Sequence, residues 1–206
     1  RGLPDVPGAD LPHVLTGDAL RGVITGEAGA DQRSLNSFGK FAVATGRSLG
    51  LLNSADRIRT LSKTWMPVGK RVVVIGGGLV GLELAEFLAA RGRQVTVLEE
   101  GPHLGLPMAM PRRWTAINKA TKHGVVLVRD AAVVSIDKVS VRYRSGDNEF
   151  EVRGDSVVVA SQVEPDVQLA ELLSDLGIRV QVVGDALNIG YIEGAIHTAN
   201  RVAREL

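Results

Sequence analysis

The hydrophobic pattern becomes regular from residue 71 onward, where short apolar runs alternate with segments of helical periodicity. The run at 71–75 is apolar apart from Arg71, and the run at 94–98 carries Val95, Val97 and Leu98, so both predict short strands. The segment between them has helical spacing over 79–91 and is ended by Gly92. This alternation predicts an α/β domain of Rossmann type, with a parallel central sheet covered by helices.

A second pattern interrupts this alternation in the middle of the domain. The runs at 138–144 and 148–153 flank the turn Ser145-Gly-Asp-Asn148 and predict a β-hairpin, with a further strand at 131–136. We therefore expect a β-hairpin crossover that adds a third layer to the domain. The other predicted elements are a helix at 111–122, strands at 125–128 and 155–160, a helix at 167–175, a strand at 179–183 and a C-terminal helix at 190–205.

The first part of the chain has a different composition. Residues 1–17 are rich in proline, glycine and aspartate and predict an extended connector that enters a helix near Thr16 or Asp18. Apolar residues at helical spacing within 18–67 predict a small helical insertion.

Three glycines between the predicted strand 71–75 and helix 79–91 carry the clearest functional signal. Gly76, Gly78 and Gly81 form the spacing G-x-G-x-x-G, in which the first permits a tight turn, the second lets the backbone approach a pyrophosphate and the third lets the helix pack closely. The free N–H groups and the positive end of the helix dipole would meet the phosphates. The motif therefore predicts dinucleotide binding, against the alternative of a packing turn without a ligand.

An acidic residue stands where such a site needs one. Glu99 ends the next predicted strand, 18 positions after Gly81, close to the ~20 expected for a carboxylate that accepts from the adenosine ribose hydroxyls. A solvated strand-end acid, or Glu100 as the ligand, remains an alternative. Both carboxylates would repel a 2′-phosphate, and no arginine occurs between 94 and 111, so we expect NAD(H) to be favoured over NADP(H).

Composition narrows the functional classes. The 206 residues hold 24 Lys+Arg, 23 Asp+Glu and no cysteine. The near balance of charge argues against nucleic acid as a partner, and no apolar run approaches the ~20 residues of a membrane helix. Without cysteine this chain offers no thiol pair, cysteine nucleophile or iron–sulfur ligands, and the four histidines lack metal-ligand spacing. We expect a soluble cytoplasmic protein, with a homo-oligomer left open, whose redox chemistry comes from an organic cofactor.

The order of motifs resembles a known family. A strand Asp155-Ser-Val-Val-Val-Ala-Ser-Gln162 follows the hairpin crossover, and Val182-Val-Gly-Asp-Ala186 precedes the last helix. This order resembles the C-terminal region of the NADH:flavin oxidoreductases of the 2,4-dienoyl-CoA reductase and trimethylamine dehydrogenase group, over most of 1–17 and 68–206. One departure is Ala160-Ser161-Gln162, where the family has Ala-Thr-Gly.

The resemblance implies roles for domains and residues. It makes 1–17 a connector from an FAD domain, 68–162 the NAD(P)-binding domain and 163–206 the closing part of the FAD-binding domain. The family's first glycine motif, for FAD, and its barrel with FMN and an iron–sulfur cluster would precede Arg1, so we expect the chain to be a fragment with part of an FAD site. The implied cofactor-binding residues are Gly76, Gly78, Leu79, Val80 and Gly81 for the pyrophosphate, Glu99 for the ribose, Glu83 near the nicotinamide, and Gly184 and Asp185 for FAD.

Some of these residues have simpler explanations, and two rival functions stay open. Glu83 could serve the helix dipole alone, and Asp185 could only cap the following helix or turn. The main expectation is hydride delivery from NADH to FAD, with no catalytic side chain demanded of this chain. The rival is a non-catalytic ADP-binding structural module of a trimethylamine dehydrogenase-like flavoprotein. A stand-alone dehydrogenase is disfavoured, because no catalytic arrangement of side chains is evident.

Overall fold

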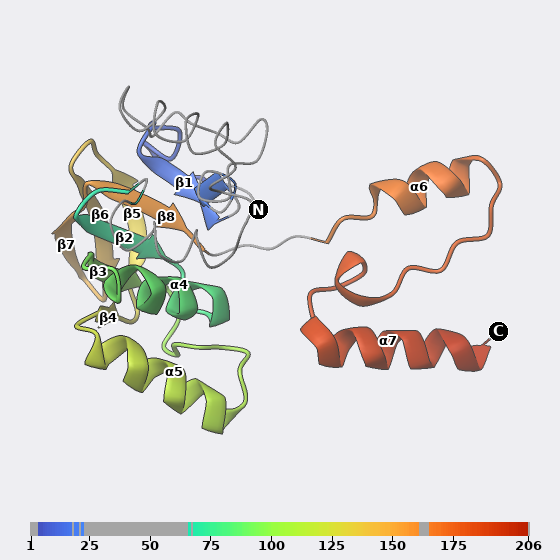
Figure 1. Cartoon of the computed structure of the whole chain (residues 1–206). Helices are drawn as coiled ribbons and strands as arrows, with labels where there is room; N and C mark the ends of the chain where they lie inside the picture. The colour runs from blue at the N-terminus through green and yellow to red at the C-terminus, as the bar shows by residue number, and fades with distance from the viewer. Residues whose placement is uncertain are drawn as a thin grey trace, which may run out of the picture. The chain divides into compact units, whose positions relative to one another are not determined.

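The computed structural model describes residues 4–17, 19–20, 22, 66, 68–160 and 165–205. The chain divides into two compact units (Figure 1). The first comprises Leu3–Ser161, and the second comprises Gln162–Leu206 together with Arg1–Gly2.

The first unit is built on a five-stranded parallel sheet with the order β1-β8-β2-β3-β4. Every residue of β8 and four of the five residues of β2 are buried, as expected for apolar strands covered on both faces. The strands of this sheet are β1 (Val14–Thr16), β2 (Arg71–Ile75), β3 (Gln94–Leu98), β4 (Val126–Val128) and β8 (Ser156–Val159).

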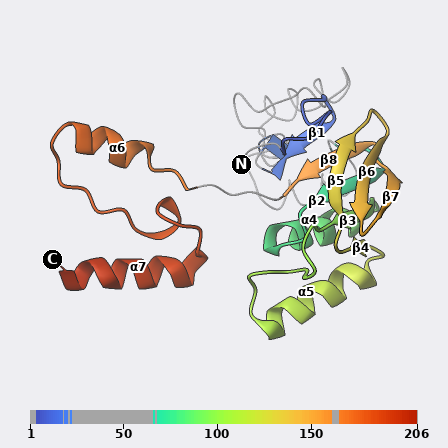
Figure 2. The same ribbon diagram turned by 180° about the vertical axis from the view of Figure 1, so that it is seen from behind.

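Two different layers cover the sheet. Helices α4 (Leu79–Ala89) and α5 (Met110–Lys122) share a core with Val72 and Val74 of β2. The antiparallel strands β5 (Ala132–Ile136), β6 (Ser140–Ser145) and β7 (Asn148–Arg153) belong instead to the core that holds Val73 and Ile75. Figures 1 and 2 show the helices and the small antiparallel sheet on either side of the central strands. The predicted three-layer α/β fold with a hairpin crossover is confirmed.

The segment predicted as a connector contributes a strand that the sequence analysis did not assign. Val14–Thr16 pairs with β8 at the edge of the sheet. The preceding turn packs against the hairpin layer, where the Ile136 N–H donates to the Pro7 carbonyl. Beyond it, the Thr16 hydroxyl accepts from the Ala19 N–H at 3.1 Å, so a helical turn does begin near Thr16. Apart from residues 19, 20, 22 and 66, the predicted insertion 18–67 lies outside the described residues.

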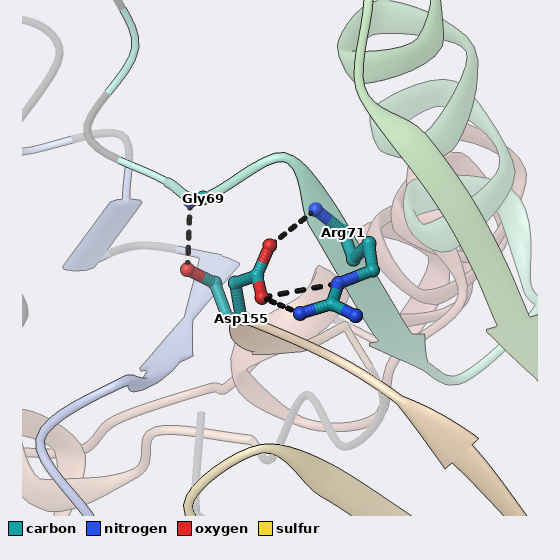
Figure 3. A network of polar contacts seen from close by, with 4 residues as sticks. Gly69, Arg71 and Asp155 are labelled. Carbon is teal, nitrogen blue, oxygen red and sulfur yellow. Dashed lines mark hydrogen bonds and ion pairs between the residues drawn. The ribbon is translucent and has the colours of Figure 1, made fainter.

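A polar network ties β2 to β8 at their amino ends (Figure 3). The Arg71 guanidinium donates to Asp155 Oδ1 from Nη2 at 2.5 Å and from Nε at 3.1 Å, while the Arg71 backbone N–H donates to Oδ2 at 2.9 Å. The Ser156 hydroxyl accepts from the Gly69 N–H at 3.0 Å. The side-chain and backbone hydrogen bonds from Arg71 hold the pKa of Asp155 below its usual value. This network lies at the amino ends of the parallel strands, whereas the glycine turn follows the carboxyl end of β2.

The second unit contains α6 (Gln168–Asp175), the short 3-10 turn η2 (Gly184–Ala186) and α7 (Tyr191–Glu205). The predicted strand at 179–183 is wrong, since these residues have irregular backbone. A strand needs a neighbour to accept and donate its hydrogen bonds, and residues 165–205 contain no other strand. Neither helix buries a side chain, and Leu176 and Ile192 are 75% and 80% exposed.

Candidate nucleotide-binding site

The glycine turn follows β2 directly, and two of its glycines have a steric reason. Gly76 has φ of 102°, a conformation that side chains rarely adopt, and its N–H donates to the Leu98 carbonyl at 2.8 Å. A Cβ on Gly81 would lie 1.8 Å from the Gly76 carbonyl oxygen. The first and third glycines of the motif therefore let α4 press against the turn that precedes it.

Gly78 begins α4 and leaves its amino end open. It is the N-cap, no side chain caps the helix, and no acidic residue stands in its first turn. The first N–H groups of a helix have no partner within it, and here they include those of Leu79 and Val80. An uncapped helix start without a nearby carboxylate in its own first turn favours an anion such as a phosphate. These backbone groups fit the pyrophosphate of a dinucleotide.

The loop that follows β3 packs on the turn and constrains a glycine that the motif did not single out. A Cβ on Gly77 would lie 2.5 Å from Leu104 Cδ2 and 2.9 Å from Glu99 Cβ. The Gly105 N–H donates to the Gly77 carbonyl at 2.7 Å. Gly77, the residue between the first two glycines of the motif, is therefore also sterically restricted. The sequence pattern alone could not indicate this.

Glu99 is joined to the glycine turn and is not a free acid at a strand end. Its Oε2 accepts from the Gly77 N–H at 2.6 Å and its Oε1 from the Gly101 N–H at 2.9 Å. The residue is half-buried, whereas Glu100 is exposed. Glu99 thus stands between the turn and the following loop, close to the start of α4. Its role as a ribose ligand stays a prediction.

Glu83 lies one turn further along α4 and is engaged by the neighbouring helix. The Arg112 guanidinium of α5 donates to Glu83 Oε1 at 2.7 Å, and both side chains are more than half exposed. The residue lies past the first turn of α4, where the helix dipole acts most strongly. The ion pair, which the sequence analysis missed, gives Glu83 a structural partner, and its predicted place near a nicotinamide is untested.

Gly184 and Asp185 lie in the second unit, beside α7. Gly184 has φ of 67° and its N–H donates to the Thr198 hydroxyl at 2.8 Å. Asp185 Oδ1 accepts from the N–H groups of Gly190 and Tyr191 at 2.9 and 2.8 Å. Asp185 therefore caps the start of α7, the simpler role that the sequence left open for it. The seven predicted residues of the first unit are gathered around one turn and helix, and these two belong to a separate unit.

Two arginines that the sequence analysis did not assign to the site lie along the loop after Glu99. Arg113 Nε donates to the Leu104 carbonyl at 2.5 Å, and Arg129 Nη1 lies 3.5 Å from the Pro102 carbonyl. Both lie outside residues 94–111, a segment that contains no arginine. The strand order could have indicated Arg129, because it follows β4, the neighbour of β3.

Comparison with known proteins identifies the family. Residues 28–186 match the family described as pyridine nucleotide-disulphide oxidoreductase, which is more than half of the chain. The chain belongs to this family. Its members use FAD and NAD(P)H, so the dinucleotide site predicted from the glycine turn lies in a protein class that binds such cofactors. Among the described residues, no group of side chains could hold a metal ion and no helix is long and apolar enough to cross a membrane.

Several relatives in this family are oxidoreductases. The chain is 35% identical over 140 residues to an NADH oxidase of Thermoanaerobacter brockii, covering 66% of the chain and 21% of that protein. It is 35% identical over 130 residues to a bilirubin reductase of Mediterraneibacter gnavus, covering 63% of the chain and 20% of the relative. The matched region thus spans about a fifth of the length of these curated relatives.

Solved structures show the same fold at lower identity. A 2-naphthoyl-CoA reductase complex superposes with a TM-score of 0.67 at 19% identity, covering 100% of this chain and 25% of that one. The 6-hydroxypseudooxynicotine amine oxidase from Pseudomonas geniculata gives 0.63 at 20% identity, covering 98% and 25%. At these identities the likeness concerns the fold alone.

Proposed function

We propose that the first unit is an NAD(H)-binding domain and that, in the whole protein, it delivers hydride from NADH to FAD in a flavoprotein resembling 2,4-dienoyl-CoA reductase. The observation that carries the proposal is the uncapped start of α4 beside the carboxylate of Glu99. In this proposal residues 68–162 form the NAD(P)-binding domain, 163–206 close an FAD-binding domain, and Gly184 and Asp185 serve the FAD side.

The described residues can bind the pyrophosphate and the ribose of an ADP moiety together. The N–H groups at Leu79 and Val80 face a pyrophosphate without competition from a capping side chain. Each carboxylate oxygen of Glu99 holds one backbone N–H, and an ionised carboxylate has about four lone-pair sites. Glu99 therefore keeps acceptor capacity for ribose hydroxyls while it holds the turn in place.

The carboxylates at the end of β3 favour NADH over NADPH. A 2′-phosphate on the adenosine ribose would face the carboxylates of both Glu99 and Glu100, and like charges at short range repel. When bound, the nicotinamide supplies a hydride and FAD accepts it. The residues of this chain bind and orient the dinucleotide, and no side chain of the glycine turn has to donate or accept a proton.

A second candidate is a non-catalytic site that holds ADP for structural reasons, as in a trimethylamine dehydrogenase-like protein. The observation that favours it concerns Glu83, the acid predicted near the nicotinamide. This carboxylate is already paired with Arg112 at 2.7 Å, whereas the start of α4, predicted to contact the pyrophosphate of the ADP half, has no capping side chain. Both candidates share the glycine turn and differ in whether nicotinamide is used.

Titration of the 206-residue chain with NADH tests the binding claim. A Cβ on Gly78 would lie 3.1 Å from the Leu106 carbonyl oxygen, so the branches of Gly78→Val would fill the space in front of the turn. We expect a change in nicotinamide fluorescence with the natural chain and none with Gly78→Val. Gly194→Val is the control, because a Cβ there meets nothing within 4 Å.

Unchanged nicotinamide fluorescence on titration of the natural chain would refute NADH binding. Hydride delivery is tested on the whole protein, by adding NADH without oxygen and following the flavin absorbance. Bleaching supports hydride transfer to FAD. Persistent yellow colour, with ADP still bound by the natural chain, would instead support the structural module.

A further inference from the structure

Arg129 is placed level with Glu99 at the carboxyl edge of the sheet. In the parallel ladder between β3 and β4, Leu98 is the partner of Val128, and the next residues along are Glu99 and Arg129. The Glu99 N–H donates to the Val128 carbonyl at 2.9 Å, which continues the pairing past the end of β3. Neighbouring strands lie about 4.8 Å apart, so the backbone of Arg129 is one strand spacing away from the backbone of Glu99.

The turn that follows Arg129 is fastened to the loop that follows Glu99. Asp130 has φ of 52°, and its N–H donates to the Gly101 carbonyl at 3.2 Å. The Arg129 Nη1 atom lies 3.5 Å from the Pro102 carbonyl. The Ala131 N–H also donates to the Glu99 carbonyl at 2.9 Å, so two backbone hydrogen bonds hold the turn that carries Arg129 beside Glu99 and its loop.

The guanidinium of Arg129 is available to a ligand. The residue is exposed, and its hydrogen bond to Pro102 is long. Within the described residues, four arginines form salt bridges with carboxylates, namely Arg71, Arg112, Arg142 and Arg144. No carboxylate of these residues pairs with Arg129. A planar cation of this kind stacks on flat ring systems.

The order of the strands gives the direction of a bound dinucleotide. A pyrophosphate at the start of α4 lies after β2, and a ribose held by Glu99 lies after β3. The base attached to that ribose then continues in the same direction, toward the end of β4. Ligands of open α/β sheets bind outside the carboxyl ends of the strands, which is where Arg129 stands.

We propose that Arg129 forms the adenine side of the nucleotide site, with its guanidinium stacked on the adenine ring. This inference rests on the proposed function, because it takes the ribose to be at Glu99. A neutral ring suits this place better than a 2′-phosphate, since Asp130 follows Arg129 in the sequence and Glu99 and Glu100 stand at the end of the neighbouring strand, which makes this edge rich in acidic residues.

The test compares Arg129→Ala and Arg129→Lys with the natural chain, by calorimetric titration with NADH, ADP and NADPH. If adenine stacks on the guanidinium, Arg129→Ala should raise the dissociation constants of NADH and ADP by the same factor, about five- to thirty-fold, because both ligands carry adenine. Lysine keeps the charge without the plane and should recover less than half of the loss. Arg144→Ala removes an equal charge from the hairpin layer, where the side chain pairs with Glu149, and should leave all three affinities unchanged.

Each other result points to a different explanation. Equal NADH affinity of Arg129→Ala and the natural chain would overturn the stacking proposal and leave NAD(H) binding intact. Full recovery of the NADH affinity in Arg129→Lys would mean that the charge alone acts. A greater loss of affinity for NADPH than for NADH in Arg129→Ala would assign the arginine to a 2′-phosphate. Either result would overturn the stacking proposal. Failure of the natural chain to bind NADH and ADP would refute the proposed function itself.

Discussion

Replacing Gly81 by alanine would separate the glycine turn from the helix that presses on it. The added Cβ would lie 1.8 Å from the Gly76 carbonyl oxygen. Carbon and oxygen atoms in close contact are ordinarily about 3.3 Å apart, so the two backbone segments must separate by about 1.5 Å. Neither atom can move by rotation of a flexible side chain, and the start of α4 must therefore shift away from β2.

The size of the effect follows from two opposing contributions. Inserting one carbon into a packed contact costs about 1–3 kcal/mol, whereas Gly→Ala inside a helix contributes up to about 1 kcal/mol of stability. The clash is between backbone atoms and belongs at the upper end of its range, so we expect a net loss of about 1–2 kcal/mol. For a chain of this size that corresponds to a fall in Tm of roughly 2–8 °C.

The assay is thermal unfolding followed by circular dichroism, together with NADH titration of the same samples. Gly194→Ala is the matched control, since it also lies inside a helix but a Cβ there meets nothing within 4 Å. This control should unfold at the natural temperature or slightly above it. If Gly81→Ala unfolded no earlier than Gly194→Ala and bound NADH normally, the close approach of α4 to the turn would not matter, and the steric argument would be refuted.

Two further predictions concern carboxylates. Glu99→Gln leaves one oxygen for two N–H donors and removes a charge, so we expect weaker NADH binding and a smaller preference for NADH over NADPH; an unchanged ratio of the two dissociation constants would contradict the charge argument. Asp155→Asn should lower stability at pH 7 by about 1 kcal/mol. Because the native pKa of Asp155 is lowered, the contribution of this carboxylate is present above its unfolded pKa of about 3.9 and is lost as pH falls through the native value. The stability difference between the two proteins in urea unfolding should therefore shrink as pH is lowered below about 4, and a difference that did not change with pH would contradict this linkage.

The parts of the fold that the sequence predicted are those with a strong local pattern. The run 71–75 is apolar apart from Arg71, so a strand was the natural expectation, and the turn at 145–148 defined the hairpin. The strand at Val14–Thr16 was missed because its pairing with β8 joins residues about 140 positions apart. The wrong strand at 179–183 shows the converse, since an apolar run forms a strand only where another strand is available to it.

The candidate site could be anticipated from the sequence in the same uneven way, because the groups that lie around it are of two kinds. Gly76 and Gly81 are specified by the residue type itself, because the first has φ of 102° and the second leaves no space for a Cβ against the Gly76 carbonyl. Side chains such as Arg112 and Arg129 contact Glu83 and the loop after Glu99 through helix packing and strand order. The segment 94–111 contains no arginine, although the sheet brings Arg129 to the side of Glu99. The charges around the ribose site of a Rossmann domain come from the residues that follow several neighbouring strands. The preference for NADH or NADPH should therefore be argued from the strand next to the one that carries the acid as well as from that strand itself.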